Sequence, residues 1–74
     1  MYVSVRYYKS GGFYAGNEYT YETKLKLVPG DKVIAPTAKE PRQRGLVERV
    51  NLPKPAFFCR EIAEYDPEAG EVTV

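Results

Sequence analysis

The chain has 74 residues, close to the lower limit at which one hydrophobic core stabilises a domain without disulfides. One cysteine and no histidine exclude an internal disulfide and the usual Cys/His zinc site, so we expect neither a metal nor a cofactor. No apolar run approaches the roughly 20 residues of a membrane span, and no apolar N-terminal segment is present. We therefore expect residues 1–74 to form one soluble, cytoplasmic domain that does not engage a membrane.

The formal net charge of +1 hides an uneven distribution of charge along the chain. Residues 1–60 hold eleven basic and five acidic residues, a net charge of +6, whereas residues 61–74 hold five acidic residues and no basic one. Such asymmetry is typical of a nucleic-acid-binding surface with an acidic appendage. It is equally expected where an acidic segment packs beside a basic body. The sequence leaves both interpretations open.

Two stretches of alternating side chains predict an N-terminal hairpin. Residues 2–8 alternate with Val3, Val5 and Tyr7 on one face, which is the pattern of a half-buried strand. Alternation resumes at Glu18 and continues to Leu27. Residues 9–17 between them include three glycines, so we expect a long, flexible tip.

The middle of the chain reads as a turn, a strand, a basic loop and a further strand. Residues 29–31 (Pro-Gly-Asp) predict a type II turn, with glycine at the position that requires a positive φ. A short buried strand is expected over residues 32–36 and another over residues 45–50, where Gly45 permits a bend or a close backbone approach. The polar loop between them spans residues 37–44.

The C-terminal third begins with a proline-rich connector over residues 51–56. Residues 60–65 are predicted as a strand, and a short helical turn can form just before it, at residues 56–59. Residues 65–72 carry the Asp-Pro…Gly pattern of a tight hairpin. Such a hairpin would pair Tyr65 with Val72 and Ala63 with Val74.

These elements predict an all-β fold, a five- to six-stranded, strongly bent antiparallel barrel of the Src-homology-3-like or KOW-like kind. A more open β-roll is the alternative. The run GDKVIAP, a variable loop and then GLVERV (residues 30–50) resembles the N-terminal β-domain of primosomal replication-restart helicases. That resemblance covers roughly a third of the chain and implies the fold more than the activity.

The first candidate site is basic. Lys39, Arg42 and Arg44 lie in or beside one loop, and Arg6 and Arg49 are expected nearby. Together they would contact phosphates without regard to base sequence. The alternative is a solvated loop that keeps a small protein in solution. If these side chains pair with the acids of residues 61–71 instead, the nucleic-acid interpretation loses its main support.

The second candidate site is aromatic. Phe13 and Tyr14 lie at the predicted hairpin tip, and Tyr8 lies close to it in sequence. Exposed aromatic side chains can stack on unpaired bases or fill an apolar pocket on a protein. The alternative is that the tip folds back over an open end of the barrel.

Catalysis is not expected, because the carboxylates lie on turns and outward strand positions and no histidine can activate Cys59. We therefore expect a binding module that engages nucleic acid or a nucleoprotein complex, as a monomer or weak homodimer. The alternative is an adaptor or inhibitor of a protein partner. A chain this small is common among phage and mobile-element accessory proteins, of which anti-CRISPR inhibitors are one kind.

Overall fold

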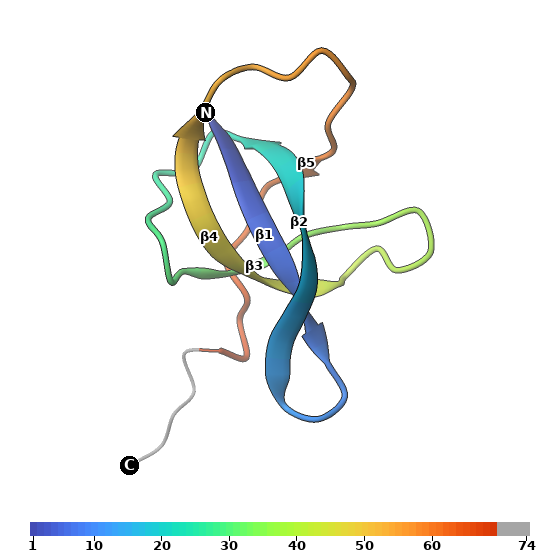
Figure 1. Ribbon diagram of the computed structural model, residues 1–74. Coiled ribbons are helices and arrows are strands. Elements are labelled where there is room, and N and C mark those ends of the chain that lie inside the picture. The colour runs from blue at the N-terminus through green and yellow to red at the C-terminus, as the bar shows by residue number, and fades with distance from the viewer. Residues whose placement is uncertain (70–74) are drawn as a thin grey trace.

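The computed structural model describes residues 1–69, and these form five β-strands and no helix (Figure 1). The strands are β1 (Tyr2–Lys9), β2 (Phe13–Thr23), β3 (Lys32–Ile34), β4 (Arg44–Leu52) and β5 (Glu61–Ile62). They form one sheet in the order β3-β4-β1-β2-β5. All neighbouring pairs are antiparallel except β2 and β5, which are parallel. The predicted all-β fold is confirmed, with that one parallel pair as a difference.

The sheet curves until its two edges nearly meet. After β5 the chain crosses to β3, where the backbone of Val33 bridges that of Tyr65. The Ile34 N–H donates to the Glu64 carbonyl at 3.2 Å, and the Asp66 N–H donates to the Lys32 carbonyl at 2.9 Å. The result is a nearly closed barrel, compatible with a Src-homology-3-like barrel.

The core lies inside this curve and is built mainly from β-branched side chains of the inward faces of the strands. Its largest fully buried members are Ile62, Val3, Val5, Val33, Val47 and Thr23. Gly45 is buried where β4 crosses between β1 and β3, and a Cβ there would lie 3.3 Å from the Ala35 Cβ. The predicted close approach at this glycine is confirmed.

The prediction of a long flexible tip over residues 9–17 is wrong. Strand β1 continues to Lys9 and β2 begins at Phe13, so only a tight turn with Gly12 at φ +85° separates them. The Gly12 N–H donates to the Lys9 carbonyl at 3.0 Å. The hairpin therefore extends as a paired ribbon beyond the body of the barrel (Figure 1).

The second strand also ends earlier than expected, at Thr23 rather than Leu27. The Thr23 hydroxyl accepts the Leu25 N–H at 3.0 Å, which bends the chain and turns Leu27 into the core. The turn at residues 28–31 is as predicted. Gly30 has φ +97°, and the Asp31 N–H donates to the Val28 carbonyl at 3.1 Å.

The predicted strand over residues 60–65 is divided between two neighbours. Only Glu61 and Ile62 pair with β2, and Tyr65 then bridges β3. The optional helical turn before it does not form, since residues 56 and 57 are bends. Asp66 opens a turn as expected, but the predicted partners Val72 and Val74 lie outside the described residues.

Candidate functional site

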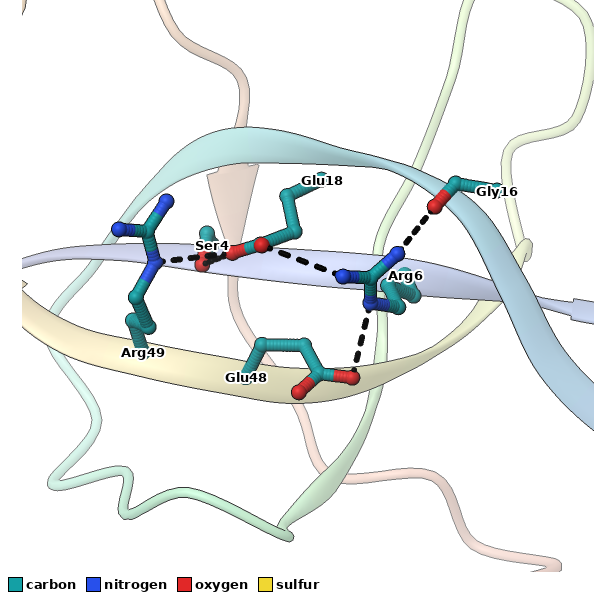
Figure 2. Close-up of polar contacts among 6 residues, drawn as sticks. All are labelled: Ser4, Arg6, Gly16, Glu18, Glu48 and Arg49. Carbon is teal, nitrogen blue, oxygen red and sulfur yellow. Dashed lines mark hydrogen bonds and ion pairs between the residues drawn. The ribbon is translucent and has the colours of Figure 1, made fainter.

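Four charged side chains form an ionic network on the outer face of β1, β2 and β4 (Figure 2). Arg6 donates through Nε to Glu48 at 3.0 Å and through Nη2 to Glu18 at 3.3 Å. Arg49 donates to the other oxygen of Glu18 at 2.9 Å, and the Ser4 hydroxyl donates to that oxygen at 2.6 Å. Three strands are tied together by these contacts.

The network neutralises two of the arginines predicted to contact phosphates. Hydrogen bonds from Ser4 and from Arg49 hold the pKa of the Glu18 carboxyl below its ordinary value. Glu18 therefore stays ionised between the two guanidinium groups. Arg6 makes one further hydrogen bond, because it also donates to the Gly16 carbonyl. A phosphate would have to compete with these partners to reach Arg6, whereas Arg49 uses only its Nε in the network and its side chain is 65% exposed.

A separate ion pair, between Arg44 and Asp66, is more deeply buried than this network. The Arg44 Nε donates to the Asp66 carboxylate at 2.5 Å, and the Asp66 side chain is fully buried. Burial opposes ionisation of Asp66, but the hydrogen bonds from Arg44 and from the Glu68 N–H outweigh it, so its pKa lies below the ordinary value. The Arg44 guanidinium also lies 4.4 Å from the centre of the Tyr8 ring.

The basic loop itself projects from the barrel (Figure 1), and its Arg42 side chain reaches the acidic segment. Arg42 donates to Glu64 at 2.7 Å, and this ion pair is exposed. Lys39 is exposed and makes no ion pair with any residue between 1 and 69. Of the predicted basic site, the four arginines are thus held by carboxylates of the same chain.

The predicted aromatic site is divided by the structure. Tyr8 and Tyr14 are cross-strand neighbours with ring centres 5.2 Å apart, edge to face, and Tyr8 also contacts Arg44. The Tyr8 ring therefore covers the Arg44 guanidinium, and Tyr14 packs against Tyr8. Phe13 lies at the hairpin end with 54% of its surface exposed.

A different aromatic surface lies along the outer edge of β2. A groove of about 300 Å³ separates the second half of this strand from the segment before β5. Tyr7 and Tyr19 stack in it with ring centres 4.8 Å apart and planes inclined by 8°. Phe57 and Phe58 line its other side and are 64% and 91% exposed. The full lining is Tyr7, Glu18, Tyr19, Thr20, Tyr21, Phe57, Phe58, Cys59 and Arg60.

The groove follows from local sequence. Tyr7 and Tyr19 continue the inward faces of their strands past the closed part of the core, so their rings reach the barrel rim. The proline-rich connector carries the chain across to β5, as the arch above the barrel shows (Figure 1). Sequence reasoning did not assign Phe57 and Phe58 a role in binding. The sequence signal that could have indicated such a role is the presence of two adjacent phenylalanines in a segment without strand alternation.

Burial raises the pKa of the Tyr21 hydroxyl, which donates to the Pro36 carbonyl at 2.9 Å. It likewise raises the pKa of the Cys59 thiol, beside this groove. Such a thiol behaves as a small apolar side chain.

Within residues 1–69 no three His, Cys, Asp or Glu side chains are grouped as a metal site would need. The same part of the chain has no helix that is long and apolar enough to cross a membrane.

The fold and the groove define the class of the protein as a small, nearly closed all-β barrel with an exposed aromatic edge. Comparison with known proteins found no matching family model, no matching curated protein and no matching solved structure.

Proposed function

We propose that this protein is a non-catalytic binding module that engages a protein partner through the groove between β2 and the segment of residues 57–60. One observation carries the proposal: Phe57 and Phe58 expose 64% and 91% of their surface beside stacked tyrosines. Large aromatic side chains at a groove are the residues that dominate protein–protein binding energy. Adjacent exposed aromatics of this size are uncommon on a surface without a partner.

The electrostatics favour a protein over nucleic acid. Nucleic-acid binding without base recognition draws its affinity from cations that are free to replace counterions. Here Arg6, Arg42, Arg44 and Arg49 already have carboxylate partners. An adaptor or an inhibitor of a host enzyme, including one from a phage or mobile element, fits this chemistry.

Nucleic-acid or nucleoprotein binding stays the second candidate, favoured by the exposed Phe13 and by Lys39, which has no ion pair within residues 1–69. The likeness of residues 30–50 to primosomal replication-restart helicases agrees with a nucleoprotein setting. The groove would then bind a protein component of that complex.

The experiment is capture of partners from a lysate of the source cells, with and without nuclease. We expect a nuclease-resistant partner that is lost with the double variant Phe57→Ser/Phe58→Ser. Phe13→Ser is the matched control, because it also removes an exposed aromatic ring but lies away from the groove. A partner that nuclease releases, or that survives the double variant, would contradict the proposal.

A further inference from the structure

The two edges of the curved sheet differ in a way that bears on the partner. The β3 edge is covered by residues 64–66, which run beside it and exchange backbone hydrogen bonds with Lys32 and Ile34. The β2 edge is covered by β5 only at Glu22 and Thr23. From Phe13 to Tyr21, β2 pairs only with β1 among the described residues, so the side of β2 that faces away from β1 has no partner strand there.

Backbone groups of β2 point into the groove along this open edge. The Glu22 N–H faces β5 and donates to the Arg60 carbonyl at 3.0 Å, whereas the Thr23 N–H faces β1 and donates to the Met1 carbonyl at 2.9 Å. Because alternate residues of a strand direct their backbone groups to the same side, the Thr20 N–H and C=O also face the open side. Thr20 lines the groove. An edge of this kind is a template for another strand.

We propose that the groove binds an extended segment of a partner protein as an added strand on the β2 edge, with an apolar side chain against Tyr19 and Phe57 and an acidic side chain near Arg60. This inference rests on the proposed function and specifies the chemistry of the partner. Strand addition of this kind combines main-chain hydrogen bonds with pockets for alternate side chains.

At the β3 edge, the protein's own chain already combines backbone pairing with ion pairs between carboxylates and arginines. There an extended segment pairs through its backbone, and Glu64 and Asp66 place carboxylates against Arg42 and Arg44. At the β2 edge Arg60 lines the groove, and it makes no ion pair with any of residues 1–69. Glu18, the other charged residue of the lining, is already held by two arginines. Charge complementarity therefore selects a segment with a carboxylate.

A second copy of this chain is disfavoured as the occupant. Antiparallel pairing of two β2 edges about Thr20 would set Glu18 of one copy opposite Glu22 of the other. Glu22 already has Glu61 as its neighbour on β5. Like charges directly opposite each other destabilise a strand pair.

The test uses twelve-residue peptides selected from a random displayed library against the full chain. We expect peptides with apolar residues at every second position and at least one Asp or Glu. Two synthetic peptides of the consensus sequence are then made. One is N-methylated at the alternate positions whose N–H groups lie on one edge of the extended peptide, and the other at the positions whose N–H groups lie on the opposite edge. Methylation on the pairing edge should weaken binding about tenfold or more, roughly 1.4 kcal/mol, whereas methylation on the free edge should have little effect.

Two substitutions test the protein side. Thr20→Pro removes the N–H that we assign to the added strand, and Thr20→Val keeps it, so only the first should lose the peptide. Arg60→Gln should weaken the acidic peptide but not its Asp→Asn counterpart. N-methylated peptides keep the test decisive if Thr20→Pro fails to fold.

Several results would overturn strand addition: equal loss on methylating either edge, a proline-rich or helical consensus, dimerisation through β2, or no selected peptide. The outcome of the lysate capture separates the two claims. If a nuclease-resistant partner still depends on Phe57 and Phe58, strand addition alone has failed. If no such partner exists, the proposed function has failed with it.

Discussion

Arg44 and Asp66 meet at 2.5 Å, although 22 residues separate them in the sequence. The Asp66 side chain is fully buried and Arg44 is largely covered, with the Tyr8 ring against its guanidinium. The pair joins β4 to the segment that closes the barrel. Arg44, a residue expected to contact phosphate, thus forms an ion pair within the fold.

Replacing Asp66 with asparagine should destabilise the fold by about 2 kcal/mol, because a buried charge-assisted hydrogen bond is lost and Arg44 keeps an uncompensated charge. Urea unfolding followed by circular dichroism measures this. Glu64→Gln is the matched control, since its ion pair with Arg42 is exposed and such pairs contribute little. Equal effects of the two substitutions would contradict the assigned role.

The same pair sets a dependence of stability on pH. The folded-state pKa of Asp66 lies below its ordinary value of about 3.9, so the ionised form stabilises the folded state. This contribution is present above the unfolded-state pKa and is lost as the pH falls through the folded-state pKa. The difference in unfolding free energy between wild type and Asp66→Asn should therefore be constant from pH 7 to 5 and shrink in stronger acid. A difference that grows in acid would contradict the assignment.

Removing the negative charges of Glu18 and Glu48 from the ionic network on β1, β2 and β4 should strengthen nucleic-acid binding. The double variant Glu18→Gln/Glu48→Gln frees Arg6 and Arg49 from their partners. We expect stronger binding of a labelled 20-nucleotide DNA, measured by fluorescence anisotropy, and loss of that binding as salt increases.

The control for that experiment is Glu22→Gln/Glu61→Gln, which changes the net charge equally. Neither of these glutamates is ion-paired with any of residues 1–69, so no arginine is released. If both double variants bind DNA equally, net charge alone is responsible and the network does not mask the arginines.

The buried hydroxyl of Tyr21 stabilises the chain where it leaves β3. It donates to the carbonyls of Ala35 and Pro36 and contacts the Tyr7 hydroxyl at 2.8 Å. Tyr21→Phe should lower the unfolding free energy by about 1 kcal/mol, because it leaves these groups without their partner. Tyr19→Phe is the control, since its ring is 44% exposed and its hydroxyl has no hydrogen bond among the described residues. A larger loss from Tyr19→Phe would contradict this.

The backbone plan of the protein was predictable because its signals are local. Alternation in β1 and the Pro-Gly-Asp turn each depend on neighbouring residues, and both predictions are confirmed. The length of the hairpin could not be predicted in this way, because Phe13 and Tyr14 pair across strands with Lys9 and Tyr8 despite the glycines around them. Cross-strand pairing overrode the local flexibility.

The ion pairs were harder to predict than the strands. Alternation shows that Arg6 and Glu18 face outward, but not that β4 brings Glu48 and Arg49 beside them. The surplus of acid after residue 60 did indicate internal complementarity as one of two interpretations. Arg42–Glu64 and Arg44–Asp66 are the contacts that this interpretation anticipated. The exposure of Phe57 and Phe58 depends on the path of a proline-rich connector, which no periodicity determines.

Calorimetric titration of the captured partner protein against two double variants tests the central claim most directly. We predict that Phe57→Ser/Phe58→Ser abolishes measurable binding, whereas Lys39→Ala/Arg42→Ala changes the affinity less than threefold, or about 0.6 kcal/mol. The reverse pattern would contradict the account: binding kept without the two phenylalanines and lost without the loop cations would place the interface on the basic loop.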